Sequence, residues 1–204
     1  MIASDFDPAS FEIVNVVDTC AVWNLVSSPT LYNSARAAGL KACVTGFVQY
    51  EALVKPRTSP TAEDAELVAR ASKAISTKEI TVHPLDIEDL QDIEVLRARK
   101  ALGRGELSSI VFAKKVNIAM LSDDRKATTL AGEVLASKSR ATTTPRLLGW
   151  LLFYSHLSIA DVEVVVQEHQ AMCRPLEPHF RRMVEIIEGY MRVARGMGGG
   201  PRPV

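Results

Sequence analysis

The sequence has few cysteines and no excess of charge of either sign. Its three cysteines, at positions 20, 43 and 173, show no CxxC spacing. This argues against a disulfide framework and a structural zinc site, and it predicts a reducing compartment. Lysine and arginine total 24, and so do aspartate and glutamate. The chain therefore lacks an overall signature for binding polyanions, although the balance does not exclude a local basic patch.

The sequence also lacks a long apolar run. The longest, over residues 147–157, is too short to span a bilayer and is interrupted by His156. The first residues, MIASDFDPAS, carry acidic charge and no apolar segment, so we expect no secretory signal. A hydrophobic content of 47% with 24% charged residues is ordinary for a globular protein. We therefore expect a cytoplasmic protein with no membrane partner.

Short runs rich in β-branched residues alternate with helical patterns along the chain. The runs predict strands over residues 13–17, 41–44, 80–83, 117–121 and 141–144. This alternation predicts an α/β fold, with a parallel sheet covered by helices on both faces. We assign residues 1–157 to this domain, 158–195 to a C-terminal helical extension and 196–204 to a flexible tail.

Acidic residues follow the predicted strands. Asp18 comes directly after the first strand, and Asp123 and Asp124 come after the fourth. Glu51 lies in the helix after the second strand, and Glu106 opens the helix that leads into the fourth. Because ligands bind at the carboxyl ends of parallel strands, we expect these carboxylates to converge. Their mutual repulsion requires a cation, and a set of oxygen ligands favours Mg²⁺ or Mn²⁺.

Each carboxylate also has a purely structural explanation. Asp18 can cap the first helix, Glu51 can be a solvated helix residue, and Glu106 can face its own helix dipole. One of the two consecutive aspartates can cap the helix that follows them. Four acidic positions in this order, at strand ends and helix starts, are nevertheless hard to reach by coincidence. A metal site of this kind activates water and stabilises the leaving oxygen of a phosphodiester.

Four segments resemble the acidic motifs of PIN-domain nucleases. They are VVDTCAVWNLV, VTGFVQYEAL, LGRGELSSIVFAKK and AMLSDDRKATTLA, and the resemblance covers residues 13–157 in order. In pattern the chain is most similar to VapC-like toxins of bacterial toxin–antitoxin systems and to related uncharacterised PIN proteins. The resemblance implies a three-layer α/β/α sandwich with a central parallel five-stranded sheet. It also implies divalent-metal-dependent cleavage of RNA, usually single-stranded.

The resemblance carries over to individual residues of this chain. It implies that Asp18, Glu51, Glu106 and Asp124 are catalytic, and that Asp18, Glu106, Asp123 and Asp124 hold the metal. Thr19 and Ser122 would be supporting hydroxyls. The usual Thr-x-Asp spacing selects Asp124 over Asp123, although SDD offers both. Position 106 departs from many toxins, which carry Asp there, but Glu after Gly also occurs in relatives.

A basic segment surrounds two of the acidic motifs. Residues 97–126 contain eight basic and three acidic side chains, which suits a nucleic acid held by its phosphates around a metal site. Arg104 and Arg125, next to site carboxylates, are the best candidates for RNA contacts, and either can instead form a structural ion pair. If the chain is a toxin, a cognate antitoxin is expected to cover the acidic cleft.

Apolar residues of the last two predicted helices can pack on the core or build a homodimer. These residues are Val162, Val165, Val166, Ile186, Ile187 and Met191.

Three other functions compete with metal-dependent RNA cleavage. A haloacid-dehalogenase-type phosphatase needs a second acid two residues after the first, where this chain has Cys20. A non-catalytic PIN-like module that binds protein would not need the retained carboxylates. Cleavage of DNA or structured RNA is compatible with the same motifs.

Overall fold

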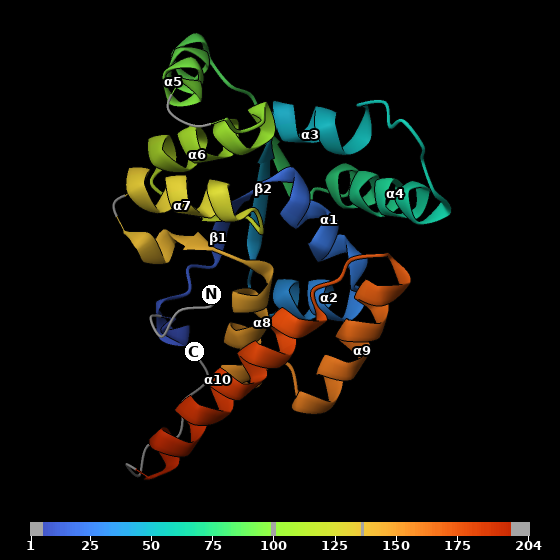
Figure 1. Cartoon of the computed structure of the whole chain (residues 1–204), viewed down its shortest axis with the longest axis vertical. Helices are drawn as coiled ribbons and strands as arrows, with labels where there is room; N and C mark the ends of the chain where they lie inside the picture. The colour runs from blue at the N-terminus through green and yellow to red at the C-terminus, as the bar shows by residue number, and fades with distance from the viewer. Residues whose placement is uncertain (1–5, 99–100, 136, 197–204) are drawn as a thin grey trace.

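The chain folds around a five-stranded sheet in which neighbouring strands are parallel. The computed structural model describes residues 6–98, 101–135 and 137–196. The strands are β1 (Val14–Val17), β2 (Lys41–Thr45), β3 (Ile80–His83), β4 (Ala119–Leu121) and β5 (Ala141–Thr142). Helices lie on both sides of the sheet (Figure 1). The predicted three-layer α/β/α sandwich with a parallel five-stranded sheet is therefore confirmed.

The direction of strand addition reverses once. The spatial order is β3-β2-β1-β4-β5, so the chain moves outward from β1 to β3 and then returns to the other side of β1. Val17 is paired with Leu121 where β1 and β4 end. In open parallel sheets, ligands bind at the carboxyl ends of the strands beside such a reversal. Asp18 and Ser122, the next residues, stand at this point.

The helices divide into two groups by the face they cover. One face carries α1 (Thr19–Ser27), α2 (Pro29–Ala37), α3 (Gly46–Leu53), α4 (Ala62–Ser76) and α8 (Thr144–Phe153). The other carries α5 (Ile87–Arg97), α6 (Arg104–Val116) and α7 (Arg125–Val134). The chain continues with α9 (Ile159–Ala171) and α10 (Glu177–Gly196), and short 3₁₀ turns occupy Pro8–Ser10 and Lys138–Arg140.

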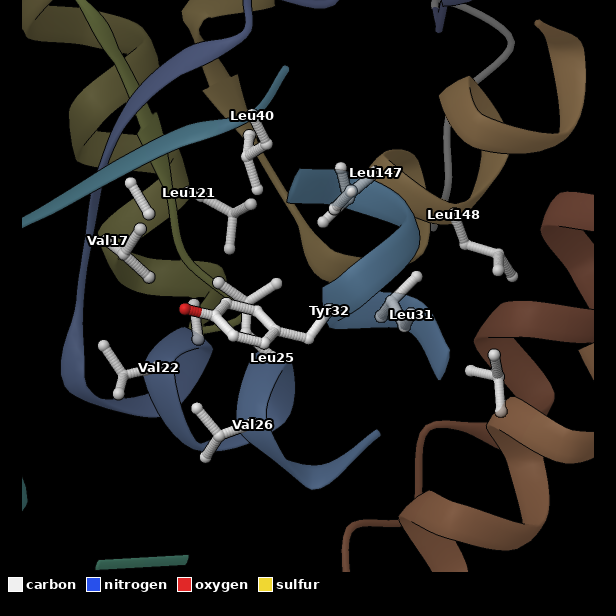
Figure 2. Close-up of a cluster of buried hydrophobic side chains, with 14 of the residues drawn as sticks. Val17, Val22, Leu25, Val26, Leu31, Tyr32, Leu40, Leu121, Leu147 and Leu148 are labelled. Atoms are coloured by element: carbon white, nitrogen blue, oxygen red, sulfur yellow. The ribbon is translucent and has the colours of Figure 1, made fainter. Parts of the chain in front are cut away.

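The side chains of successive strand residues point into the two opposite cores, as strand geometry requires. Val16 joins a core with Ile110 of α6 and Met120 of β4. Val17 points the other way, into a core with Leu25 and Leu147 that Figure 2 shows. A sheet covered on both faces explains why the strands read as continuous apolar runs and not as alternating ones.

The C-terminal helices share the core of α1, α2 and α8. Val162, Val165, Val166 and Ile187 are buried in it, and Ile186 and Met191 pack against it. These side chains therefore pack on the core, one of the two arrangements open from the sequence; a homodimer stays a prediction. Of the predicted flexible tail, Gly196 ends α10, and residues 197–204 lie outside the described residues.

Several predicted boundaries are wrong by one or two residues; the fifth strand, expected over residues 141–144, is Ala141–Thr142, and Thr144 begins α8. Helix α6 begins at Arg104, two residues before Glu106, and Asn117 is not in the fourth strand. Asn117 instead ends α6 in the left-handed region, at a φ of 57°, a conformation that asparagine tolerates better than most residues. Among the described residues, no helix combines the length and hydropathy needed to cross a membrane.

Candidate functional site

Asp18 is fully buried where β1 passes into α1. Its Oδ1 accepts a hydrogen bond of 2.8 Å from the backbone N–H of Ala21 and thereby caps α1. Its Oδ2 accepts a hydrogen bond from the hydroxyl of Ser122, which follows β4. The predicted meeting of the first and fourth motifs is therefore a direct contact. The capping role considered for Asp18 is confirmed as well, and the two roles use different oxygens.

The environment of Asp18 opposes its negative charge. The pKa of its carboxyl is raised from 3.8 to about 7, mainly by burial; the hydrogen bonds from Ser122 and Ala21 lower it, and the charges of Asp123 and Glu106 add to the rise. Asp123 and Glu106 thus each lie close enough to Asp18 to oppose its ionisation. A cation between them would reverse this effect.

Glu51 and Thr19 form the next part of the site. The hydroxyl of Thr19 donates a 2.8 Å hydrogen bond to Oε2 of Glu51, which links α1 to α3. Gly105, in the first turn of α6, lies against this pair, and a Cβ there would lie 3.0 Å from the Thr19 hydroxyl and overlap Glu51 Oε2. Glycine at this position lets α6 approach the carboxylate closely.

Glu106 lies in the first turn of α6, where the helix dipole favours a negative charge. Its Oε2 is buried and has no hydrogen-bond partner among the described residues. Its carboxylate lies over Gly103, where a Cβ would overlap it. An unpaired buried oxygen costs free energy unless a ligand or cation meets it.

The two consecutive aspartates differ in their partners. Asp123 accepts hydrogen bonds from Asn24 Nδ2 at 2.7 Å and from the N–H and hydroxyl of Thr144 at 2.8 and 2.6 Å. Asp124 caps α7, since its Oδ1 accepts from the N–H groups of Lys126 and Ala127. The expectation that one of the two caps the next helix is confirmed. Asp124 keeps Oδ2 outside these bonds.

The five carboxylates, Asp18, Glu51, Glu106, Asp123 and Asp124, together form what we call the acidic edge. Their supports include two residues that the sequence did not single out, Asn24 and Thr144. A polar residue inside the apolar segment AVWNLV was the signal that the sequence offered for Asn24. Nothing local marked Thr144, because its partner lies 21 residues earlier in the chain.

Cations border the acidic edge. Arg104 lies over the ring of Phe47 at 5.8 Å. Arg125 lines a pocket of about 290 Å³ together with Asp123 and with His179 of α10. Arg174, from the segment between α9 and α10, lies 5.8 Å from the ring of Trp23 in α1. Arg125 thus shares a pocket with a site carboxylate, whereas Arg104 lies in the same helical turn as Glu106 and contacts Phe47. The C-terminal segment adds His179 and Arg174, which the sequence did not single out.

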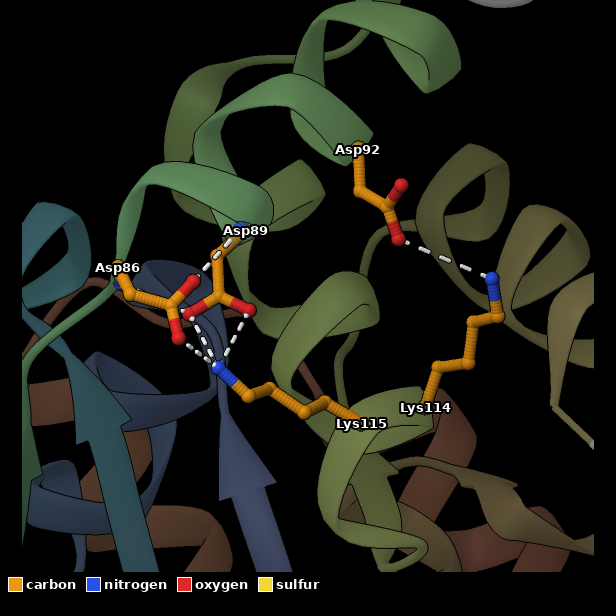
Figure 3. Close-up of polar contacts among 5 residues, drawn as sticks. All are labelled: Asp86, Asp89, Asp92, Lys114 and Lys115. Carbon is orange, nitrogen blue, oxygen red and sulfur yellow. Dashed lines mark hydrogen bonds and ion pairs between the residues drawn. The ribbon is translucent and has the colours of Figure 1, made fainter.

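Other basic residues of the same segment pair elsewhere. Lys115 contacts Asp86 and Asp89, and Lys114 lies 3.8 Å from Asp92, as Figure 3 shows. These acidic residues belong to α5 and its N-cap, and we call the five residues the paired cluster. Arg97 pairs with Glu94 within α5, whereas the predicted cations at positions 99 and 100 lie outside the described residues.

The acidic edge offers suitable oxygen atoms for a divalent ion, but the described side chains do not form a complete set of metal ligands. Within the described ranges, no three acidic, imidazole or thiol side chains are arranged as a set that could hold a metal. The chemistry of the donors nevertheless fits Mg²⁺ or Mn²⁺, because they are carboxylates and a hydroxyl without histidine. The partnerless Glu106 oxygen and the charge-opposing surroundings of Asp18 fit a cation as well.

Comparisons with known proteins identify no relative of this chain. No family model, no curated protein and no solved structure matches the chain.

Proposed function

We propose that the protein is a divalent-metal-dependent endoribonuclease that hydrolyses phosphodiester bonds of single-stranded RNA at the acidic edge. The observation that carries the proposal is the fully buried Asp18 beside Glu106 and Asp123, at the reversal point of a parallel sheet. A buried carboxylate with two further carboxylates beside it is costly to keep ionised without a counter-charge. The PIN-like order of the motifs supports the same function.

Asp18, Glu106 and the aspartates after β4 would hold Mg²⁺ or Mn²⁺. Bound there, the ion would lower the pKa of a water molecule and stabilise the leaving oxygen. Ser122 and the N–H of Ala21 fix the orientation of Asp18, and Thr19 fixes that of Glu51. Asn24 and Thr144 hold Asp123 in place in the same way. Such supporting contacts maintain metal ligands in a defined geometry.

The substrate would approach along the cationic side chains at the border. Arg104 and Arg125 stand at the starts of α6 and α7, where a phosphate also meets the positive end of the helix dipole. Phosphate contacts of this kind position a strand without reading its bases. If the protein is a toxin, a cognate antitoxin would bind across the same edge.

One observation favours a second candidate, a non-catalytic module that binds protein. Asp124 caps α7, and both oxygens of Asp123 are occupied by Asn24 and Thr144. In this alternative, the aspartates after β4 serve only to join α1, α7 and α8.

Cleavage of a short labelled single-stranded RNA tests the proposal. The assay uses the wild type with Mg²⁺, Mn²⁺ or EDTA, beside Asp18→Asn and the matched variant Asp86→Asn in the paired cluster. We expect metal-dependent cutting that Asp18→Asn lowers by at least about a hundredfold, since loss of even a supporting partner costs ten- to a hundredfold. Asp86→Asn should cut like the wild type. Full activity of Asp18→Asn would overturn the mechanism.

The binding of Mn²⁺, measured by calorimetry, separates the two candidates if no RNA is cut. A folded wild type that binds Mn²⁺, with binding lost in Asp18→Asn, would favour a nuclease that requires a particular target sequence. A wild type that binds no metal would favour the module.

A further inference from the structure

Another part of the sheet, away from the acidic edge, also has the features of a ligand site. Helix α6 packs on β1, β2 and β4, and α7 packs on β4 and β5. The helices packed on β3 are α3 and α4, both from the opposite layer. The α6 side of β3, together with the start of β2 at Lys41, is therefore largely uncovered. Parallel sheets are normally buried on both faces, so this open face calls for an explanation.

A groove of about 730 Å³ occupies this open face, and we call it the β2–β3 groove. Its floor includes Cys43 and Thr81, which are register partners in β2 and β3, and Val14 from β1. Phe112 and Val116 of α6 form its wall. Val14 and Val116 leave 37% and 43% of their surfaces exposed. A volume of this size is typical of small-molecule sites.

The two ends of the groove differ in chemistry. At one end, the ring of His83 packs on Phe112 with centroids 5.0 Å apart. The other end carries Lys41, Lys78 and Arg36, against the single carboxylate of Glu79. Glu79 is already paired with Arg36 at 3.1 Å. Neither lysine forms an ion pair with any residue that the structure describes, so this end presents two uncompensated positive charges over an apolar floor.

We propose that the β2–β3 groove binds an amphipathic carboxylate, with its apolar body over Val14 and Val116 and its carboxylate at Lys41 and Lys78. Apolar contact with the floor and wall would supply the affinity, and the lysines would set the orientation and the preference for an anion. The lysine end of the groove lies at the amino ends of β2 and β3, whereas the acidic edge lies at the carboxyl ends of β1 and β4. The proposal therefore does not depend on nuclease activity.

Decanoate is a suitable probe, with decanol and decyltrimethylammonium as neutral and cationic analogues. Each is titrated into ¹⁵N-labelled full-length protein while backbone amide shifts are followed by NMR. We expect saturable decanoate shifts at Val14, Cys43, Thr81 and Val116. Decanol should bind at the same place at least about tenfold more weakly, and the cation more weakly still. Equal affinity for all three probes, or shifts confined to other residues, would overturn the proposal.

Two variants test the two halves of the groove. The double variant Lys41→Ala/Lys78→Ala should lower the decanoate affinity about tenfold and leave that of decanol unchanged. Val116→Glu should weaken both, and Lys73→Ala, on the exposed side of α4, should weaken neither. Because all four changed positions are exposed, the unfolding temperature should stay near that of the wild type. Unchanged decanoate affinity in the double lysine variant would disprove the role of the lysines.

Discussion

Two groups of carboxylates in this protein have opposite electrostatic surroundings. At the acidic edge, burial and neighbouring charges raise the pKa of Asp18 to about 7. In the paired cluster, the hydrogen bond from Lys115 holds the pKa of Asp86 below its ordinary value. Asp89 is 4% exposed and also contacts Lys115, at 3.0 Å.

The difference between the groups lies in their partners and not in the number of acidic residues. In the paired cluster, lysines from α6 meet the aspartates of α5, so the charges are compensated within the fold (Figure 3). At the acidic edge, the partners of the carboxylates are hydroxyl, amide and backbone N–H groups. Such partners orient a carboxylate without cancelling its charge, and this is the arrangement that leaves a role for a bound cation.

The largest expected effect concerns the stability of the metal-free protein. The pKa of Asp18 is raised in the folded state, so the protonated side chain contributes fully to the free energy of unfolding below about pH 4. This contribution is lost as the pH rises to about 7. The loss amounts to about 4 kcal/mol. Asp18→Asn keeps the shape of the side chain without the charge. Its free energy of unfolding, relative to that of the wild type, should therefore rise by this amount over the same pH range.

Chemical denaturation of both proteins in EDTA from pH 4 to pH 8 gives this difference curve. Added Mg²⁺ should then stabilise the wild type at pH 8 and leave Asp18→Asn unchanged. A flat difference curve would show that the folded protein does not oppose the ionisation of Asp18.

The second effect separates the geometry of the acidic edge from its charge. A Cβ at Gly105 would overlap Glu51 Oε2, and this flexible carboxylate can move at little cost in stability. We expect Gly105→Ala to unfold near the wild-type temperature but to cut RNA about ten- to a hundredfold more slowly, because misplaced catalytic groups lose about that much. Gly46→Ala is the matched control, since no atom lies within 4 Å of its added Cβ. Wild-type activity of Gly105→Ala would remove Glu51 from the mechanism.

The architecture of the acidic edge was largely predictable from the sequence. Parallel strands end at one edge of a sheet, so residues directly after the strands were expected to converge there. Asp18 and Ser122 meet directly because β1 and β4 are neighbours in the sheet. The support of Asp123 was not predictable. Asn24 lies inside a helix and Thr144 begins another, and only the packing of α1 and α8 brings both to the same carboxylate.

The basic segment shows a second limit of prediction from the sequence, because residues that are near in sequence can lie far apart in space. Lys114 and Lys115 are near Glu106 in sequence, but α6 carries them about 13 Å along its axis, at 1.5 Å per residue. They therefore meet the aspartates of α5 and lie away from the acidic edge. Arg104, two residues before Glu106, remains in the same turn of the helix.

A smaller effect is expected from the cations that border the acidic edge. Arg104→Ala and Arg125→Ala should each weaken RNA binding several-fold in EDTA and reduce the slope of log affinity against log salt by about 1. The reason is that each variant loses one phosphate contact. Fluorescence anisotropy at several salt concentrations measures both quantities, and Lys73→Ala on α4 serves as the control. A salt slope equal to that of the wild type would mean that neither arginine touches the strand.

The smallest effect tests the paired cluster itself. Lys115→Met removes the cation but keeps an apolar stem of similar length, so the pKa of Asp86 should return toward its ordinary value. We expect a loss of thermal stability that high salt removes only in part, because the pair with Asp86 is exposed and screened whereas Asp89 is 4% exposed. Lys114→Met, whose partner Asp92 is 3.8 Å away, should change nothing measurable. RNA cleavage should be unaffected in both variants, because these lysines contact the aspartates of α5 and its N-cap and lie away from the acidic edge. Reduced cleavage in Lys115→Met alone would mean that the paired cluster influences the acidic edge through α6.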